Sequence, residues 1–571
     1  MSKKLSPKQL AKALEYNSVR PFSSLQEMLT IARDTNPDKE AFMYKEKGQQ
    51  KSVTYREFKD QTIALGTAFN ELGLSKSHIA CIGENSYLWV LSYLTVVGSE
   101  GVFVPIDKLI EDEAILNLLR HSESEALIFG GERYAEIIRK NRDKLTGIKY
   151  FISMDIEEDT EEFVSLRRLV SRGFELVAAG DQSYESMKSD PNALKMLVYT
   201  SGTTGNPKGV MLSEHNLVSS VYYGLHVCTV HTKCLSVLPY HHTYEAVCGL
   251  LVGLYKNVTI CINESLRTVL PNLQHYKPDY IYLVPAFVEV FYKRIWDTAE
   301  KTGKAKMLRI LIKVSNALRK CGIDLRRKLF ASVTKNFGGN LVKIVCGGAP
   351  LRSEVGDFFD SIGIALMNGY GISECSPLVS VNRDQISDPA TVGFPLPCLE
   401  VKIDDPDEDG NGEIMVKGDV VMLGYYKMPE ESAVALQDGW FRTGDFGHFS
   451  EIGQIVITGR KKNIIILANG KNVYPEELEN SVMSIPYVKE VIVSEYTRSE
   501  DGEKQGLSAE VFLDKDKLAE LGVEDAEKKI KEDVDALCES MPPYKKITRV
   551  VVRDTEFAKT TSNKIKRSYA K

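Results

Sequence analysis

The chain has 571 residues, of which 43% are hydrophobic, and its formal net charge is -6. A single hydrophobic core rarely serves a chain of this length, so we expect at least two domains. The acidic balance argues against a general nucleic-acid binder, because neutralising phosphates requires a basic surface.

Cysteine usage and hydropathy give the expected compartment. The 10 cysteines are scattered without a CxxC pair, which is typical of reduced core thiols rather than of a disulfide framework. The N-terminus is polar, and no apolar run reaches the roughly 18 residues that a membrane span requires. We therefore expect a cytoplasmic protein, with peripheral contact to a membrane surface left open by the basic stretch at 301–335.

The first third of the chain alternates apolar runs with helical patterns. A capping-box pattern at 24–27 predicts the start of a helix that continues through 28–33. Further along, the pattern predicts buried strands at 79–83, 102–105 and 126–129 and helices at 87–98 and 114–121. This alternation is typical of parallel α/β sheets.

A loop of glycine and hydroxyl residues follows, between the apolar runs 197–199 and 210–212. Its glycines let backbone N–H groups converge on an anion, its hydroxyls donate, and its lysine carries a mobile positive charge. It is not a Walker A loop, because its lysine precedes Gly209 and a strand-like run. We interpret it as a phosphate-holding loop, made of Thr200, Ser201, Gly202, Thr203, Thr204, Gly205 and Lys208.

Residues 284–339 form an extended helical stretch. From 301 to 335 the sequence has eleven Lys or Arg residues and one acidic residue, Asp324. A basic amphipathic helix can lie on an anionic membrane surface. The same composition is also typical of a solvated face on a helical insertion, so both interpretations stay open.

The last third of the chain changes to short strands with turn signals after Gly393, which predicts a small antiparallel β-subdomain. Beyond it, a charged helix at 525–538 lies between apolar runs at 507–513 and 548–552, which favours a compact α+β unit. We therefore expect a large domain over 1–461 and a small domain over 462–571.

The glycine-rich loop resembles the signature of the AMP-forming adenylating enzymes, which include acyl-CoA synthetases, firefly luciferase and peptide-synthetase adenylation domains. Segments similar to other motifs of that superfamily follow in the same order, at 238–245, 344–350, 368–374, 443–445 and 557–567. The resemblance covers nearly the whole chain. It implies a large domain of two α/β subdomains with parallel-rich sheets and a small antiparallel β-subdomain, followed by a small, mobile α+β domain.

The resemblance also implies where the nucleotide binds. Gly348, Ala349 and Pro350 would contact adenine, and Tyr370, in a segment with Asn368, Gly369, Gly371 and Ser373, would stack on it. Ser373 stands where the superfamily usually has Thr, which keeps the hydroxyl. Glu374 and Thr200 would hold Mg²⁺, and Asp445 would accept the ribose hydroxyls with help from Arg460. Considered alone, Glu374 could be a surface carboxylate and Asp445 a turn cap.

The resemblance further assigns two catalytic positions and a hinge. Lys564 would be the catalytic lysine, although Asn563 stands where a glycine is usual; Asn tolerates a left-handed backbone better than most residues. His242 would be the gate over the acyl site, and no Cys or His at ligand spacing supports zinc at this histidine pair. The small domain would turn about Lys462 and present Asn469, Gly470 and Lys471 to a thiol.

The function implied is ATP- and Mg²⁺-dependent activation of a fatty acid as acyl-AMP, followed by transfer to CoA. The basic insertion after Val284-Pro285 is similar to the long-chain fatty acid branch of the superfamily. Three alternatives stay open: transfer to the phosphopantetheine of an acyl carrier protein, a non-catalytic nucleotide- or acyl-binding protein, and a luciferase-type oxygenase. The acyl chain length and the oligomeric state also stay open.

Overall fold

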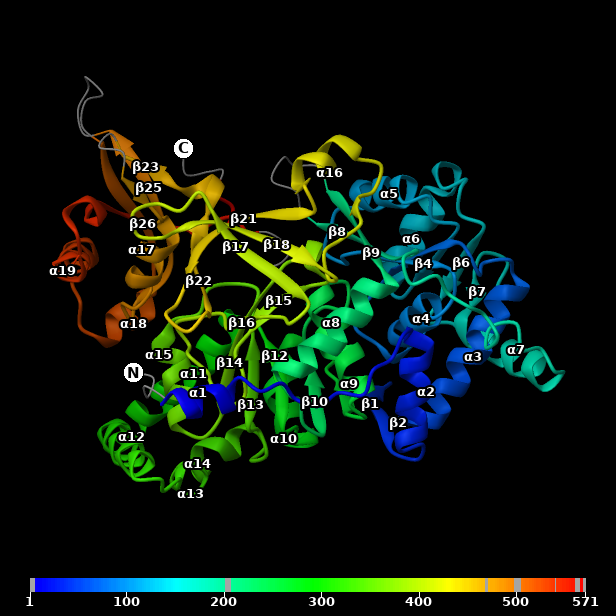
Figure 1. Ribbon diagram of the computed structural model, residues 1–571, viewed down its shortest axis with the longest axis horizontal. Helices are drawn as coiled ribbons and strands as arrows, with labels where there is room; N and C mark the ends of the chain where they lie inside the picture. Colours follow the sequence, from blue (N-terminus) through cyan, green and yellow to red (C-terminus); the bar gives the residue numbers. More distant parts are fainter. Residues whose placement is uncertain are drawn as a thin grey trace. The chain divides into compact units, whose positions relative to one another are not determined.

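A computed structural model describes residues 6–200, 207–467, 471–497, 505–539, 541–559 and 565–567. The chain forms two compact units (Figure 1). Unit 1 contains Met1–Glu400 and Val416–Phe441, and unit 2 contains Val401–Met415 and Arg442–Lys571. The boundary predicted between 461 and 462 stays a prediction.

One part of unit 1 is built on an eight-stranded sheet with the order β19-β9-β8-β4-β3-β5-β6-β7. Its strands are β3 His78–Ile82, β4 Val102–Pro105, β5 Ala126–Phe129, β6 Tyr150–Ser153, β7 Val164–Ser165, β8 Leu194–Thr200, β9 Lys208–Ser213 and β19 Gly424–Tyr425. Strands β3 to β8 run parallel to one another, whereas β9 pairs antiparallel with both β8 and β19. The helices of this part are α3 Tyr55–Glu71, α4 Tyr87–Val97, α5 Asp112–His121, α6 Glu132–Lys140 and α7 Leu166–Ala178.

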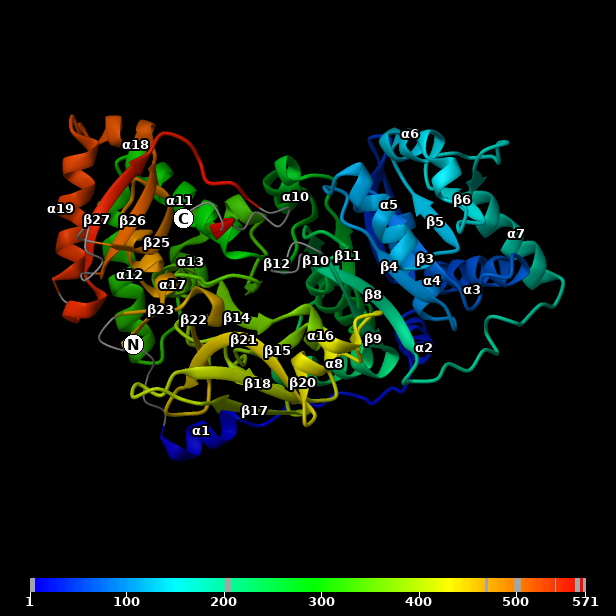
Figure 2. The same cartoon turned by 90° about the horizontal axis from the view of Figure 1, so that it is seen from above.

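The other part of unit 1 is built on a nine-stranded sheet with the order β16-β15-β14-β13-β12-β10-β11-β1-β2. Its strands are β1 Glu40–Glu46, β2 Gln49–Thr54, β10 Lys233–Ser236, β11 Thr259–Ile262, β12 Tyr280–Leu283, β13 Lys343–Cys346, β14 Ala365–Gly371, β15 Leu378–Val381 and β16 Phe394–Pro395. The strands from β1 through β14 in this order run parallel, and β2, β15 and β16 add antiparallel edges. The two sheets lie side by side within unit 1 in both views (Figure 1, Figure 2).

Helices and irregular segments complete unit 1. They are α1 Pro7–Ala13, α2 Leu25–Thr35, α8 Glu214–Val227, the π-helix η2 Tyr244–Leu251, α9 Val252–Tyr255, α10 Val269–Tyr276, α11 Pro285–Lys301, α12 Ala305–Lys320, α13 Arg326–Leu329, α14 Ala331–Thr334, α15 Ser353–Ser361 and α16 Pro429–Ala435. The predicted helical stretch at 284–339 is confirmed as α11 to α14. Within the described ranges, no helix combines the length and the apolar character that crossing a bilayer requires.

The parallel strands are apolar because both of their faces are covered. Every residue of β4, β5 and β12 is buried, and α4 is buried along almost its whole length. Continuous Val, Ile and Leu runs of this kind are typical of parallel sheets with helices on both sides. The predicted α/β alternation is therefore confirmed.

The start of α2 corrects one local prediction. The Ser24 side chain accepts a hydrogen bond from the backbone N–H of Glu27, as an N-cap does. The Glu27 carboxylate, however, accepts from the backbone and the hydroxyl of Ser23 rather than from Ser24. The capping box predicted at 24–27 is thus only half formed, because the Glu27 carboxylate binds the residue before the N-cap instead of the N-cap backbone N–H.

Unit 2 takes up the end of the chain and much of the antiparallel sheet β17-β18-β21-β20, with β22 paired to β21. These strands are β17 Leu399–Asp404, β18 Gly412–Gly418, β20 Leu436–Gln437, β21 Trp440–Phe449 and β22 Ile455–Arg460. The remaining elements are β23 Ile465–Ile466, β24 Asn472–Val473, α17 Pro475–Val482, β25 Val488–Thr497, β26 Gln505–Leu513, α18 Lys515–Glu520, α19 Ala526–Cys538 and β27 Ile547–Arg553. One apolar core joins α17 and α19 to the three-stranded sheet β25-β26-β27, which confirms the predicted α+β character.

Candidate active site

The glycine-rich loop connects two antiparallel strands. β8 ends at Thr200 and β9 begins at Lys208, and these two residues are direct partners in the ladder. The six residues between Thr200 and Pro207 lie outside the described residues. The strand pairing therefore brings the hydroxyl-bearing and the lysine-bearing ends of the loop to the same place.

Tyr425 connects two of the predicted site residues. The Lys208 ammonium lies 4.7 Å from the centroid of the Tyr425 ring, a cation–π distance. The Tyr425 hydroxyl donates a hydrogen bond of 3.0 Å to Glu374 Oε1. Burial and the neighbouring Glu374 carboxylate raise the pKa of Tyr425, so the phenol stays protonated and keeps donating.

The backbone around Tyr425 holds it at this position. β19 pairs with β9 through Tyr425 and Val210, and the Met422 N–H donates to the Glu374 carbonyl at 2.8 Å. The Tyr425 N–H donates to the Ser432 hydroxyl at 2.8 Å. Tyr425 was not among the predicted site residues, since a two-residue strand carries no periodicity that would single it out.

Two predicted nucleotide segments lie at the carboxyl ends of neighbouring parallel strands. Cys346 at the end of β13 is paired with Asn368 in β14, so the turn at Gly347-Gly348 runs beside Gly369 and Tyr370. A Cβ at Gly347 would lie 3.1 Å from the Gly369 carbonyl oxygen, which leaves little space for a side chain. Ligands of α/β sheets bind at carboxyl ends of this kind.

The residues after β13 and within β14 differ in what they offer a ligand. Gly348 has a φ of 89° and, like Ala349 and Pro350, is exposed. Tyr370 is buried, and the Asn368 amide donates to the Thr391 carbonyl at 3.1 Å. Ser373 and Glu374 follow β14 in a short 3₁₀ turn. The geometry therefore ties Asn368 to the neighbouring loop and leaves the 348–350 turn accessible.

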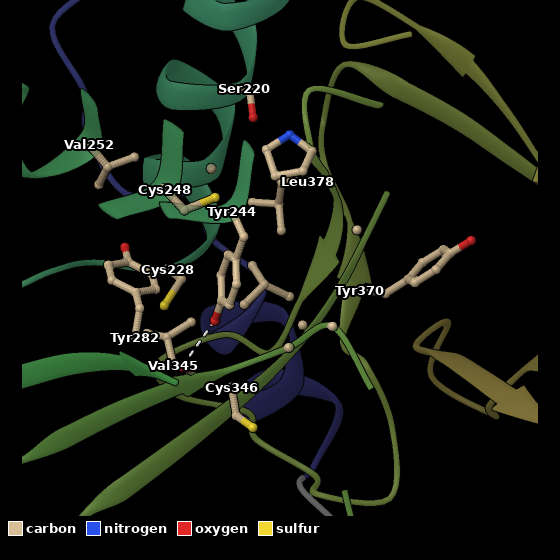
Figure 3. Close-up of a pocket in the computed structure, with 17 residues that line it drawn as sticks. Ser220, Cys228, Tyr244, Cys248, Val252, Tyr282, Val345, Cys346, Tyr370 and Leu378 are labelled. Atoms are coloured by element: carbon tan, nitrogen blue, oxygen red, sulfur yellow. Dashed lines mark hydrogen bonds between the residues drawn. The ribbon is translucent and has the colours of Figure 1, made fainter. Parts of the chain in front are cut away.

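An apolar cavity of about 90 Å³ adjoins these two segments (Figure 3). Gly347, Gly348, Gly369, Tyr370 and Gly371 form part of its lining. The rest comes from α8 and its C-cap, η2, the start of α9, β12, β13, and both ends of β15 with the proline before it: Ser220, Gly224, Cys228, Tyr244, Cys248, Val252, Tyr282, Val345, Cys346, Pro377, Leu378 and Val381. The predicted nucleotide segments and a largely apolar cavity thus share a wall.

Tyr244 stands in the middle of this lining. Its hydroxyl donates to the Val345 carbonyl at 3.0 Å, and its ring meets the Tyr282 ring edge-on at 5.7 Å. In Figure 3, Cys228, Cys248 and Cys346 surround Tyr244, whereas the Tyr370 ring points away from it. Burial raises the pKa of both Cys228 and Cys248 to about 12, so these thiols are neutral at physiological pH.

The histidine pair lies at the start of the π-helix. The His241 and His242 rings are 4.2 Å apart, and His241 Nε2 lies 3.5 Å from Asp107 Oδ1. Burial lowers the pKa of His241 to about 3, with a smaller contribution from His242, so the imidazole is neutral at pH 7. The Asn85 side chain holds the turn before the pair, because it accepts from the Tyr240 N–H and donates to the Leu238 carbonyl.

Glu245, in the first turn of the π-helix, is a buried acid that was not among the predicted site residues. Its Oε1 accepts a hydrogen bond of 2.5 Å from the Ser236 hydroxyl, and the Ser236 and Tyr240 hydroxyl oxygens lie 3.1 Å apart, within hydrogen-bond distance. Burial raises the pKa of Glu245 to about 8, so the carboxyl is mainly neutral at pH 7. π-Helical turns are frequent at functional sites, and an apolar run such as 244–251 reads as an ordinary α-helix.

In unit 2, Asp445 and Arg460 are partners in the β21–β22 ladder. Arg460 Nε lies 2.9 Å from Asp445 Oδ1, and the Asp445 side chain is only 6% exposed. Asp445 also receives support from its own turn, since its N–H donates to the Thr443 hydroxyl at 3.0 Å. The guanidinium therefore fixes the orientation of a buried carboxylate.

The predicted hinge and thiol-facing residues follow β22. Lys462 lies in a 3₁₀ turn, and burial together with Arg460 and Arg567 lowers its pKa. Lys471 Nζ lies 2.5 Å from Glu408 Oε2. Asn469 and Gly470 lie outside the described residues.

The tail that carries the predicted catalytic lysine is anchored at both ends. Lys559 and Ile565 form an antiparallel bridge, and the Lys566 N–H donates to the Ala558 carbonyl at 2.8 Å. The Lys559 ammonium pairs with Glu490 and Glu556. Arg567 Nη2 lies 2.5 Å from Glu479 Oε2. These contacts fix the described residues that precede residue 560 and follow residue 564.

Several predicted site residues lie outside the described part of the chain, and their roles stay predictions. They are Ser201, Gly202, Thr203, Thr204, Gly205, Asn469, Gly470 and Lys564. Among the described residues, no group of three or more His, Cys, Asp or Glu side chains is arranged to hold a metal ion.

The sequence patterns of two protein families match the chain. The family described as AMP-binding enzyme matches residues 30–426, and the AMP-binding enzyme C-terminal domain matches residues 462–571. The chain belongs to the AMP-binding enzyme family. The two segments at the ends of β13 and β14 lie inside the first match.

Relatives of this AMP-binding enzyme include two kinds of ligase. It is 28% identical over 460 residues to the long-chain-fatty-acid–CoA ligase FadD15 of Mycobacterium bovis, covering 77% of this chain and 75% of that one. It is also 28% identical over 515 residues to the chloroplastic long-chain-fatty-acid–[acyl-carrier-protein] ligase AEE15 of Arabidopsis thaliana, covering 77% and 70%. The anthranilate CoA ligase AuaEII, solved with anthranoyl-AMP, shares the fold with a TM-score of 0.75 at 18% identity over 96% of both chains.

The thiols of the cavity give a prediction for this AMP-binding enzyme. Because burial holds the pKa of Cys228 and Cys248 near 12, few of their thiols are ionised even at pH 9. We expect iodoacetamide to label the exposed Cys321 first. Cys228 and Cys248 should be labelled at a rate at least roughly a hundredfold lower. Peptide mass spectrometry over a time course measures this, with Cys321→Ser as the control that removes the fast label. Labelling of Cys248 as fast as that of Cys321 would contradict the buried geometry.

Proposed function

We propose that this AMP-binding enzyme is an ATP-dependent, AMP-forming acid–thiol ligase that activates a fatty acid and transfers the acyl group to CoA. One observation carries the proposal: the predicted nucleotide segments at Gly347-Gly348 and Gly369–Gly371 line an apolar, thiol-walled cavity. A nucleotide and an apolar acid bound there would have their reacting ends next to each other. Joining such partners is the chemistry of adenylation.

In the first step, a carboxylate oxygen of the fatty acid attacks the α-phosphorus of ATP. A new O–P bond forms, the bond between the α-phosphorus and the bridging oxygen breaks, and pyrophosphate leaves with the electron pair. Two anions must approach each other, so positive charge is required around the reacting centre. In the proposal Lys208 and the glycine-rich loop bind the outer phosphates, and Lys564 binds the carboxylate and the α-phosphate.

The residues around Glu374 fit a magnesium ion. Mg²⁺ prefers oxygen ligands and is usually held by one or two carboxylates together with substrate phosphates, rather than by an all-protein cage. Glu374 supplies a carboxylate whose Oε1 already accepts from Tyr425, and Thr200 supplies a hydroxyl at the edge of the loop. When bound, the ion would neutralise charge on the phosphates. Tyr425 orients the carboxylate for that role.

In the proposal, four side chains position the nucleoside and the acid. Tyr370 stacks on adenine, Asp445 accepts the ribose hydroxyls in the orientation that Arg460 fixes, and His242 controls access to the acyl cavity. The fixed Asp445 carboxylate supports the second role, since Arg460 Nε lies 2.9 Å from it.

In the second step, the thiol sulfur attacks the acyl carbonyl carbon. A C–S bond forms, the C–O bond to AMP breaks, AMP leaves, and the thiol proton passes to solvent. In the proposal the chain from Lys462 onward changes orientation between the steps, so that Asn469, Gly470 and Lys471 replace Lys564 at the site. Two half-reactions then use one nucleotide site.

A long-chain acid is the substrate that we favour. The names of the relatives in Mycobacterium bovis and Arabidopsis thaliana both specify long-chain fatty acids, and the cavity is apolar. The same two relatives differ in the acceptor thiol, so an acyl carrier protein is the second candidate acceptor. Turnover with CoA compared with turnover with a holo acyl carrier protein distinguishes the two.

Pyrophosphate exchange tests the adenylation step. We expect labelled pyrophosphate to enter ATP in the presence of a fatty acid, with the highest rate for long acids. Lys564→Ala is expected to slow exchange about 100- to 1,000-fold, the usual cost of removing one donor to a transition state. Lys566→Ala, two residues away on the same tail, is the matched control and should exchange normally. Absence of exchange with every acid would instead favour a scaffold that binds nucleotide without reacting.

The hydroxyl of Tyr425 gives a second prediction. Tyr425→Phe keeps the ring beside Lys208 but removes the hydrogen bond to Glu374, so we expect exchange to fall about tenfold and to require more Mg²⁺. Tyr426→Phe is the control, because that hydroxyl donates to the exposed Glu123. The measurement is the exchange rate of each variant over a Mg²⁺ titration. An equal loss in both variants would show that Glu374 does not depend on Tyr425.

The cavity gives a third prediction. Cys248→Phe places a ring in a cavity of about 90 Å³, so it should exclude a long acyl chain and spare a short one. We expect the ratio of kcat/KM for a C16 acid to that for a C8 acid to fall about tenfold or more. Cys321→Phe, at an exposed position, is the control. An unchanged ratio would mean that the acyl chain binds elsewhere.

A further inference from the structure

Helix α12 presents an outward face that the core of unit 1 does not use. Leu308 and Ser315 are buried on its inner side. Met307, Ile310 and Val314 are 52, 51 and 46% exposed, and their spacing of three and four residues puts them on one stripe of the helix. Figure 1 shows α12 at the outer edge of unit 1, at the lower left. Three large apolar side chains in a row are therefore left in contact with water.

A line of lysines runs beside this apolar stripe. Lys306, Lys313 and Lys320 are exposed and seven residues apart, so they follow one line along the helix. Within the described residues, no carboxylate lies within 4.0 Å of their ammonium groups. By contrast, Arg319 and Arg326 pair with Asp360, which shows that other basic residues of the stretch serve the fold.

The charge of this region is opposite to that of the whole protein. Residues 301–335 carry eleven basic side chains and one acidic one, whereas the full chain has a net charge of -6. A helix face that contacts only water does not require exposed apolar side chains. Binding to an acidic macromolecule through charge does not require them either. An anionic bilayer matches both features, because lysines reach the phosphates while apolar side chains enter the region just below them.

We propose that the outward face of α12, defined by Met307, Ile310, Val314, Lys306, Lys313 and Lys320, docks on the surface of an anionic lipid bilayer. The proposal goes beyond the proposed function and does not rest on it, because binding to lipid requires no turnover. It resolves the two interpretations of the basic stretch in favour of the membrane. It also puts the enzyme at the place where long apolar acids accumulate.

Vesicle co-sedimentation of the full chain tests the proposal. We expect binding to vesicles of phosphatidylcholine with about 30 mol% phosphatidylglycerol, and little binding to phosphatidylcholine alone. Raising the salt from about 0.05 M to about 0.5 M should weaken binding, since the Debye length falls severalfold. Equal binding to the two kinds of vesicle, or no binding to either, would overturn the proposal. Capture by immobilised polyglutamate without capture by anionic vesicles would point to an acidic protein partner and overturn it as well.

Charge variants locate the surface. The triple variant Lys306→Gln, Lys313→Gln, Lys320→Gln is expected to weaken binding on the order of a hundredfold, and Lys313→Gln alone about fivefold. The matched control is Lys144→Gln, Lys528→Gln, Lys531→Gln, which removes three exposed lysines elsewhere and should bind like the wild type. The same loss in both triple variants would overturn the assignment to α12.

Apolar variants separate a bilayer from a merely acidic surface. Met307→Ser, Ile310→Ser, Val314→Ser together should weaken binding to anionic vesicles about tenfold or more. The control replaces Leu109, Leu266 and Leu521 with Ser, at positions that are 59, 65 and 52% exposed. All six side chains are exposed, so the fold should be unaffected. Unchanged vesicle binding in the α12 variant would overturn the proposal.

Discussion

The hydrogen bond from Tyr425 to Glu374 is the interaction on which the proposed site depends. Lys208 begins a strand of the eight-stranded sheet, and Glu374 follows a strand of the nine-stranded sheet, so the two come from separate parts of unit 1. Tyr425 contacts both: its ring lies beside the ammonium and its hydroxyl donates to the carboxylate. In the proposal Lys208 binds phosphate and Glu374 binds a metal ion. These two roles require a fixed separation between the ammonium and the carboxylate, and the Tyr425 phenol contacts both groups.

The second requirement is that the nucleotide and the acid meet. In the proposal the backbone makes this possible, because a Cβ at Gly347 would lie only 3.1 Å from the Gly369 carbonyl oxygen, which leaves little space for a side chain between the turn after β13 and β14. That close approach leaves glycines on one wall of the apolar cavity and Tyr244, hydrogen-bonded to Val345, on another. The neutral thiols and the neutral Glu245 carboxyl keep uncompensated charge away from this region.

Local patterns predicted much of the fold, whereas contacts between distant segments were not predictable. Strands such as 126–129 and the helix at 525–538 follow from periodicity and caps, and α19 indeed starts after an Asp525 N-cap. Tyr425 could not be found this way, since its role comes from partners 217 and 51 residues away in the chain. The cavity likewise combines residues from 220 to 381, and the π-helical geometry of 244–251 has no signal in an apolar run. The roles of Lys564 and of the loop at 201–206 rest on motif resemblance.

The transfer of oxygen from acid to nucleotide tests the central claim most directly. A fatty acid labelled with ¹⁸O in its carboxyl group is incubated with the enzyme, ATP, Mg²⁺ and CoA, and the nucleotide product is analysed by mass spectrometry. If the carboxylate attacks the α-phosphorus, thiol attack on the acyl carbon leaves one ¹⁸O atom in the phosphate of AMP. Unlabelled AMP, or ADP accompanied by labelled inorganic phosphate, would contradict an acyl-adenylate and with it the proposed site.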